Sequence, residues 1–234
     1  MTRASVKRDQ TKRDQTKRDP ARSQERILKA ATAEFARFGL GGARVDRIAV
    51  RAGANKRMLY YYFGNKEDLF LAVLEVTYAR IRAAEEGLHL RDLPPEQGIR
   101  RLVEFTWDYY LAHPEFLTLL NSENLHKARH LKRSRNVPAM HSSFVATLGG
   151  ILERGVRDGS FRRGVDPVQL YISIAGLGYF YLSNRFTLST IFRRPLLAPR
   201  HKARRLKHMT ELVLGPGSPC QRSIPNKVHE KELY

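Results

Sequence analysis

Side chains that can bind nucleic acid are concentrated between residues 44 and 66. Arginine, lysine, tyrosine and asparagine donate hydrogen bonds to phosphates, and several of them also reach base edges in the major groove. The candidates for DNA contact are Arg44, Asn55, Lys56, Arg57, Tyr60, Tyr61, Tyr62 and Lys66. Three consecutive tyrosines would also suit a core, but neighbouring helical positions point about 100° apart, so at least one tyrosine faces outward.

Two short helices are expected to position these side chains. Residues 45–52 and 56–62 have a helical pattern and are separated by the tight turn Gly53-Ala54-Asn55. The residues spaced to pack the two helices together are Ile48, the small Ala49, Leu59 and Phe63. The Asn55 side chain is of the type that caps a helix N-terminus. The pattern predicts a helix-turn-helix whose second helix exposes the basic and tyrosine side chains.

Longer helices flank this motif. A helical stripe begins at Ser23 and is stopped by Gly39. Its apolar members are Ile27, Ala30, Ala31, Phe35 and Phe38. Asn65 is predicted to cap a long helix, with Asp68 completing a variant of the capping box, and this helix is expected to run to about Glu86.

The rest of the chain also favours helices, because no segment alternates with a period of two for long enough to indicate a strand. Helices are predicted over residues 97–112, 114–124, 138–158, 167–184 and 199–213. The prolines expected in first turns are Pro114, Pro138, Pro167 and Pro199. The fold class is therefore all-α, in two parts joined by one long helix.

The composition limits the function classes. The 234 residues include 42 Lys+Arg and 23 Asp+Glu, and the net charge of +19 suggests a polyanionic partner. A single cysteine, Cys220, excludes a disulfide framework and multi-thiolate metal sites, and a cytoplasmic location is expected. The longest nearly apolar stretch, residues 171–182, is shorter than the roughly 20 residues that span a bilayer.

The two ends of the chain differ from the middle. Residues 1–21 contain an imperfect Lys-Arg-Asp-Gln-Thr repeat with few apolar side chains, so a disordered basic arm is expected there. This arm is either a tail without contacts of its own or an arm that follows the DNA backbone or reaches a minor groove. Residues 22–66 form the predicted helix-turn-helix domain, residues 67–214 a second helical domain, and residues 215–234 a flexible tail.

The helix-turn-helix region resembles the DNA-binding domain of TetR-family transcriptional repressors. The likeness covers residues 23–74 and is carried by the runs Arg26-Ile27-Leu28-Lys29-Ala30-Ala31, Ala52-Gly53, Leu59-Tyr60-Tyr61-Tyr62-Phe63 and Lys66-Glu67-Asp68-Leu69. It implies a homodimer that binds a palindromic operator. It also implies that the second domain is a helical bundle for ligand binding and dimerisation, and that a small-molecule effector releases the operator.

The resemblance also implies roles for single residues. Tyr60, Tyr61 and Lys66 match positions that contact phosphates in the family, and Lys56 and Arg57 match positions that read bases. The sequence departs from the family at two places. Arg44 and Val45 stand where threonines often contact phosphate, so Arg44 is expected to supply that contact. Tyr62 stands at a position that is commonly histidine, so the operator sequence does not transfer.

Aromatic and amide side chains of the second half are candidates for an effector site, since a ligand in a helical bundle needs apolar walls and a few polar anchors. The candidates are Trp107, Tyr110, Phe116, Asn121, Asn124, Tyr171 and Tyr179. Taken singly, each of these residues also suits an ordinary core position.

A dimer interface is expected on the last helices. Residues 167–184 are apolar on nearly every face, and Gly176 and Gly178 would allow a second helix to approach closely. The family resemblance places the interface on this helix and on residues 199–213, as a four-helix bundle. Residues 185–210 carry eight lysines and arginines and no acid, which indicates a solvated face, a second polyanion contact, or a docking site for an acidic partner.

A metal site is a further hypothesis. Glu123, His126 and His130 would share a face if they lay on one helix, with His113 or His141 as additional ligands. Isolated helical histidines are more often surface or capping groups, so no metal and no cofactor are expected.

The leading hypothesis is therefore a ligand-responsive repressor. The alternative is a DNA-binding protein without a ligand switch, either constitutive or architectural. An enzyme is disfavoured because the chain lacks a Walker loop and the G-x-S-x-G, H-E-x-x-H and dinucleotide motifs. Binding to a membrane surface would suit the charge but not the compact helix-turn-helix.

Overall fold

Helices account for all regular secondary structure in the part of the chain that the computed structural model describes, residues 20–215 and Cys220. The all-α prediction is confirmed over this range. Residues 1–19 of the predicted arm and residues 216–219 and 221–234 of the predicted tail lie outside the described residues. None of the helices in the described range is both long and apolar enough to cross a membrane.

The chain divides into two compact units that are each discontinuous in sequence. The first consists of Met1–Ala79 and Pro114–Val137, and the second of Arg80–His113 and Pro138–Tyr234. These units are defined by packing. The predicted domains over residues 22–66 and 67–214 follow motif positions instead, and they stay a prediction about function.

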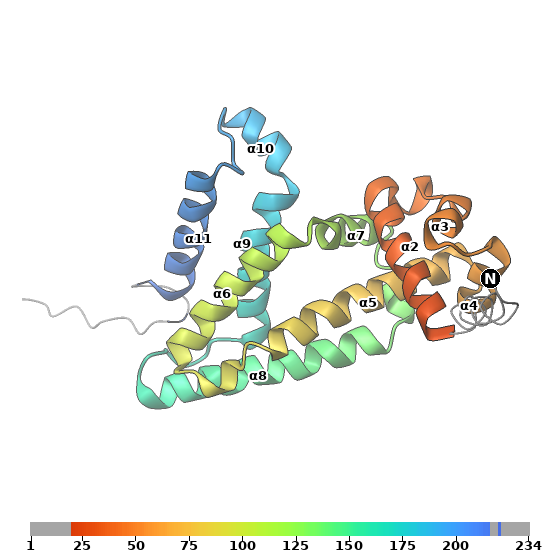
Figure 1. The fold of residues 1–234 in the computed structure, drawn as a ribbon. Coiled ribbons are helices and arrows are strands. Elements are labelled where there is room, and N and C mark those ends of the chain that lie inside the picture. Colours follow the sequence, from red (N-terminus) through yellow and green to blue (C-terminus); the bar gives the residue numbers. More distant parts are fainter. Residues whose placement is uncertain (1–19, 216–219, 221–234) are drawn as a thin grey trace, which may run out of the picture. The chain divides into compact units, whose positions relative to one another are not determined.

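The first unit is built around the predicted motif (Figure 1). Its helices are α2 (Pro20–Gly42), α3 (Val45–Ala52), α4 (Lys56–Phe63), the part of α5 (Lys66–Glu86) up to Ala79, α7 (Pro114–Leu125) and the short 3-10 helix η2 (Leu131–Arg133). Helix α7 packs against α2, although the two are far apart in the sequence.

One apolar core holds these helices together. The rings of Phe35 on α2 and Phe70 on α5 meet edge to face at 5.1 Å, and both are buried. Ile48 of α3, Leu59 of α4 and Leu119 of α7 are buried in the same cluster. Because each helix contributes to one core, the orientation of α4 within this unit is fixed by packing on several sides.

The second unit contains the remaining helices. They are the end of α5 from Arg80, η1 (Leu90–Asp92), α6 (Pro95–Ala112), α8 (Asn136–Asp158) from Pro138, α9 (Pro167–Ser183), α10 (Arg185–Ile191) and α11 (Pro199–Leu214). Helix α6 packs against both α9 and α11. The core here includes the buried side chains of Leu102, Trp107, Ile174 and Met209.

Most predicted helix boundaries agree with the structure to within two residues. The first-turn prolines are confirmed, since α7, α9 and α11 each start at a proline and Pro138 lies in the first turn of α8. Gly39, predicted to stop the first helix, interrupts α2 with a φ of 64°, but a further turn continues to Gly42. The same helix starts at Pro20 rather than at Ser23, so Pro20 and Ala21 belong to it and not to the arm.

Candidate nucleic-acid interface and effector cavity

Helix α4 has one buried face and one exposed face. Leu59 is buried, and Tyr62 and Phe63 are partly buried and pack against the core. Tyr60 and Tyr61 are 44% and 82% exposed. Lys56 and Arg57 are also exposed. The structure therefore brings four of the predicted DNA contacts onto one open surface and turns Tyr62 toward the core, where its ring lies 5.2 Å from that of Tyr61 and 6.3 Å from that of Phe63.

The turn before α4 has the predicted chemistry. Gly53 caps the end of α3 in the left-handed region, with φ 59°, and its N–H points to the Ala49 and Val50 carbonyls. The Asn55 Oδ1 atom accepts a hydrogen bond from Met58 N at 2.8 Å, which confirms Asn55 as the N-cap of α4. The side-chain oxygen of Asn55 is thus engaged in holding the helix start.

The start of α3 is held by a residue that the sequence did not indicate, Glu34 of α2. Its carboxylate is 2% exposed and accepts hydrogen bonds from Arg44 N at 3.0 Å and from Arg47 Nε at 2.6 Å. Burial alone would raise the pKa of Glu34. The hydrogen bonds from Arg44 and Arg47 and the charge of Arg47 together lower it by more, so the pKa of Glu34 lies below its usual value. Arg44 is the N-cap position of α3, and its exposed side chain remains available.

The cations around α4 are only partly neutralised. Lys56 Nζ lies 3.0 Å from Asp46 Oδ1 on the surface, and the hydrogen bond from Lys56 to Asp46 raises the lysine pKa. Lys66 Nζ lies 3.4 Å from the Gly41 carbonyl. Among the described residues, Arg57 makes no hydrogen bond or ion pair. This surface is therefore cationic and open to an anionic partner.

The second cap of the motif is also confirmed. Asp68 N donates to Asn65 Oδ1 at 2.8 Å, and Asn65 Nδ2 donates to Asp68 Oδ2 at 2.6 Å. The reciprocal bond of this capping box therefore runs between the Asn65 and Asp68 side chains. In addition, Arg133 of η2 pairs with Asp68. This cap fixes the start of α5, where Lys66 stands.

The metal hypothesis does not fit the geometry found. Helix α7 ends at Leu125 and the chain then turns through Lys127 and Ala128, which have positive φ, so Glu123 and His130 are not on one helix. His130 Nδ1 lies 2.6 Å from Glu123 Oε2 in a buried pair, and Glu123 Oε1 also accepts a bond from His130 N at 2.9 Å. No group of three potential metal ligands occurs among the described residues. The Glu123–His130 pair instead joins the end of α7 to the loop that follows it.

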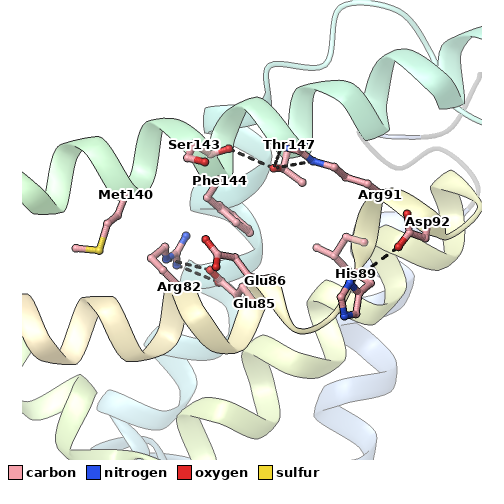
Figure 2. Close-up of a pocket in the computed structure, with 11 residues that line it drawn as sticks. Arg82, Glu85, Glu86, His89, Arg91, Asp92, Met140, Ser143, Phe144 and Thr147 are labelled. Carbon is pink, nitrogen blue, oxygen red and sulfur yellow. Dashed lines mark hydrogen bonds and ion pairs between the residues drawn. The ribbon is translucent and has the colours of Figure 1, made fainter.

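A cavity of about 240 Å³ lies within the second unit (Figure 2). Its lining residues come from the end of α5, from η1 and the loop before it, and from α8. They are Arg82, Glu85, Glu86, His89, Leu90, Arg91, Asp92, Met140, Ser143, Phe144 and Thr147. None was among the predicted effector contacts, because an Arg and a Glu three residues apart on a helix look in the sequence like an ordinary surface pair.

The seven predicted effector contacts are divided between the units. Phe116, Asn121 and Asn124 belong to the first unit. There Phe116 packs on Tyr78 at 5.6 Å between ring centroids, and exposed Asn124 donates to the Leu120 carbonyl. The contacts in the second unit are Trp107, Tyr110, Tyr171 and Tyr179.

Of these four, Tyr171 contacts a residue that lines the cavity. Its hydroxyl accepts a hydrogen bond from Arg82 Nη2 at 3.1 Å. Trp107 and Tyr110 are buried, and Trp107 lies edge to face with Tyr181 at 5.6 Å. These two residues belong to the buried core of the second unit.

Helices α9 and α11 carry exposed apolar side chains. Ile172 and Phe180 of α9 are 54% and 59% exposed, and Leu212 of α11 is 44% exposed. Gly176 is open, since a Cβ at this position would meet no atom within 4 Å, whereas Gly178 is buried and a Cβ there would lie 3.2 Å from the Tyr110 ring. Of the two glycines expected at an interface, only Gly176 faces the open side.

The basic stretch after α9 is mostly solvated. Arg200, Arg204 and Lys207 are exposed, and Lys207 Nζ lies 3.8 Å from Glu211 Oε1. Arg205 is different, because it donates to the Leu177 carbonyl at 2.8 Å and lies over the Tyr181 ring at 5.2 Å. Burial lowers the pKa of Arg205. This residue joins α11 to α9 within the unit.

Comparison with known proteins gives two family matches. Residues 27–73 match the model of bacterial regulatory proteins of the tetR family, and residues 95–213 match the tetracyclin repressor-like C-terminal domain. The chain is 44% identical over 193 residues to the HTH-type transcriptional repressor NicS of Pseudomonas putida, which covers 82% of this chain and 91% of that protein.

Solved structures share the fold at lower identity. The regulator FadR of Bacillus subtilis, solved with stearoyl-CoA, is 16% identical with a TM-score of 0.60, covering 82% of this chain and 98% of that one. AibR, solved with isovaleryl coenzyme A and operator DNA, is 18% identical with a TM-score of 0.60, covering 83% and 99%.

Proposed function

The chain belongs to the TetR family of bacterial regulatory proteins, and on that premise we propose that it is a repressor that binds a palindromic operator as a homodimer and leaves it when a small-molecule effector binds. Its family makes it a DNA-binding transcriptional regulator and not an enzyme. The observation that carries the proposal is the exposed face of α4, capped by Asn55 and oriented by a shared core. We place its action in the cytoplasm.

The exposed face of α4 supplies two kinds of contact in this proposal. Lys56 and Arg57 lie in the first turn of the helix, the part of a recognition helix that reaches base edges. Tyr60, Tyr61 and Lys66 bind phosphates, together with the side chain of Arg44 at the start of α3. To bind DNA, Lys56 must break its ion pair with Asp46, whereas Arg57 has no ion pair or hydrogen bond to break among the described residues.

Two substitutions test these roles. Arg57→Ala is expected to relax the preference at one base position, at a cost of roughly 1–3 kcal/mol, and Lys66→Ala to weaken all DNA about equally while reducing the salt slope by about one. Arg100→Ala, which removes an exposed arginine of the second unit, is the matched control and keeps wild-type affinity.

The assay is selection of bound sites from random double-stranded DNA, followed by salt titration on the recovered site. A palindrome with two half-sites supports the proposal. If Arg57→Ala and Lys66→Ala both bind like the wild type, α4 is not the recognition helix. Recovery of no sequence, with binding that collapses steeply as salt rises, favours the architectural alternative.

The apolar side chains exposed on α9 and α11 support the homodimer. Isolated exposed apolar residues are common, but Ile172, Phe180 and Leu212 border one apolar hollow formed by these helices. Phe180→Glu is therefore expected to give monomers by light scattering. Leu125→Glu, at a leucine of the first unit that is even more exposed than Phe180, is the control and stays dimeric. A dimeric Phe180→Glu variant would move the interface elsewhere.

The cavity supports effector release over the alternative of a protein without a switch. A repressor without an effector would be expected to fill such a space with its own side chains, whereas about 240 Å³ remains open here. Helix α5 contributes Lys66 at one end and the cavity residues Arg82 and Glu85 at the other. A change at the cavity thus acts on the helix that follows the DNA-binding motif.

A further inference from the structure

The cavity contains a buried arginine whose hydrogen-bonding capacity is incompletely used. Arg82 and Glu85 have side chains only 5% and 2% exposed, and Arg82 Nε lies 2.9 Å from Glu85 Oε2. Arg82 Nη2 donates to Glu85 Oε1 at 3.0 Å and to the Tyr171 hydroxyl at 3.1 Å. Within residues 20–215, the buried Nη1 atom of Arg82 has no hydrogen-bond partner, and the buried Glu85 Oε2 atom accepts no aligned hydrogen bond.

The charges of the pair do not cancel near neutral pH. Burial raises the pKa of Glu85 to about 8 although the charge of Arg82 lowers it, so the carboxyl is mostly protonated at pH 7. Arginine stays charged at every accessible pH. The guanidinium is held between the rings of Phe144, at 4.4 Å, and Tyr171, at 5.3 Å. The result is a buried positive charge without a full counter-charge, which is an unfavourable state unless an anion binds.

The walls of the cavity define what fits beside that charge. Figure 2 shows Arg82 and Glu85 at the end of α5, with Phe144 of α8 beside Arg82 and Met140 further along α8. The volume of about 240 Å³ lies below the roughly 300–1,000 Å³ of sites for drug-sized molecules, which indicates a smaller ligand. Thr147 already accepts a hydrogen bond from Arg91 Nη2 at 2.7 Å, so its hydroxyl is partly engaged.

We propose that this cavity is the binding site of a small organic carboxylate. Its oxygens accept hydrogen bonds from Arg82 Nη1 and from the Glu85 carboxyl group, and its apolar part lies against Met140 and Phe144. The ligand supplies the missing counter-charge, and carboxylate oxygens suit the planar donors of arginine. This inference rests on the proposed function, in which occupation of the cavity releases the operator.

Other titratable groups surround Glu85, and they determine the pH range over which binding is best tested. On its own helix lie Arg82 and Glu86. From α9 comes Tyr171, whose pKa is raised by burial, and from α8 His141, whose ring lies 6.2 Å from that of Tyr171. The cavity is also lined by His89, Arg91 and Asp92. The pKa of Glu85 therefore lies inside the range from pH 7 to pH 9, whereas burial raises the pKa of Tyr171 above its usual value.

The test uses the full chain and three probes that share one ring and differ in charge: benzoate, benzamide and benzylamine. Calorimetric titration at pH 7 is expected to show that benzoate binds most tightly. Between pH 7 and pH 9 the protonated fraction of Glu85 falls about tenfold, so benzoate affinity is expected to fall by about the same factor. This measurement needs no variant, and therefore does not depend on whether a substitution folds.

Two variants locate the effect. Arg82→Gln is expected to weaken benzoate by about tenfold or more and to leave benzamide nearly unchanged. Glu85→Gln replaces the carboxyl by an amide that donates at every pH, so its benzoate affinity is expected to be the same at pH 7 and pH 9. Benzamide or benzylamine binding as tightly as benzoate, or no binding by any probe, overturns the inference.

Operator binding measured with the same probes separates this inference from the proposed function. If another compound class releases the operator while benzoate does not bind, the carboxylate inference fails and the effector switch stands. If benzoate binds through Arg82 but saturation leaves operator affinity unchanged, the carboxylate site stands and release by this cavity fails.

Discussion

Replacing Glu85 by glutamine is expected to remove a large part of the pH dependence of folding stability. In the unfolded chain this carboxyl titrates near 4.5, whereas burial in the folded protein raises its pKa to about 8. Between these values the folded state holds a proton that the unfolded state has released. Stability therefore falls as pH rises through this window, and it is highest at and below the unfolded pKa.

The size of the effect follows from the window. Each tenfold change in proton affinity corresponds to about 1.4 kcal/mol, so a rise from 4.5 to about 8 amounts to a loss on the order of 4 kcal/mol across the window. Glutamine keeps an acceptor for Arg82 Nη2 but does not titrate. We therefore expect the free energy of unfolding of Glu85→Gln to change less between pH 5 and pH 8 than that of the wild type.

Urea unfolding followed by circular dichroism at pH 5, 6, 7 and 8 measures this difference without any ligand. The matched control is Glu86→Gln, which makes the same carboxyl-to-amide change at the exposed neighbouring position. Its stability is expected to run parallel to the wild type across the series. If Glu85→Gln also runs parallel to the wild type, Glu85 is ionised in the folded protein and the argument for an uncompensated Arg82 charge is refuted.

Two further substitutions probe the packing of each unit. Glu34→Gln weakens the acceptor for Arg44 N and is expected to cost about 1–3 kcal/mol at pH 7 in urea unfolding. Because the pKa of Glu34 is lowered in the folded state, this loss is expected to shrink as pH falls below 4.5. A loss that stays constant with pH would show that the shape of the Glu34 side chain, and not its charge, stabilises the fold. Gly155→Ala places a Cβ against the Phe161 ring, closer than a van der Waals contact, and is expected to lower the melting temperature through a cost of roughly 1–3 kcal/mol, while Gly150→Ala on the same helix, with open space around it, does not. Equal melting temperatures for the two alanine variants would contradict the tight contact.

Local signals in the sequence were sufficient for the DNA-binding motif. Asn55 and Asn65 are caps because their side chains bond to backbone a few residues away, and Gly53 is needed where φ is positive. Such contacts span a handful of positions, so a pattern of residue types predicts them. The first-turn prolines could be predicted for the same reason, because the fixed φ of proline and its missing N–H donor act within one helical turn.

Contacts between distant segments could not be predicted in this way. Glu34 reads as one more charge on a charged helix, and only packing shows that it holds the start of α3. Gly176 and Gly178 are two residues apart and look alike, yet one is open and the other lies against Tyr110. Arg82 is similar, because an exposed and a buried arginine have the same local sequence pattern.

The pairing of α7 with α2 has a consequence for how the chain is made. The first unit consists of residues up to Ala79 and of Pro114–Val137, so its core lacks Leu119 until the ribosome has synthesised and released the second segment. At about 5–20 residues per second, residues 80–137 take roughly 3–12 s to translate. During that interval the nascent DNA-binding helices expose apolar surface that α7 later covers, and slow translation of this stretch would lengthen their exposure to chaperones and proteases.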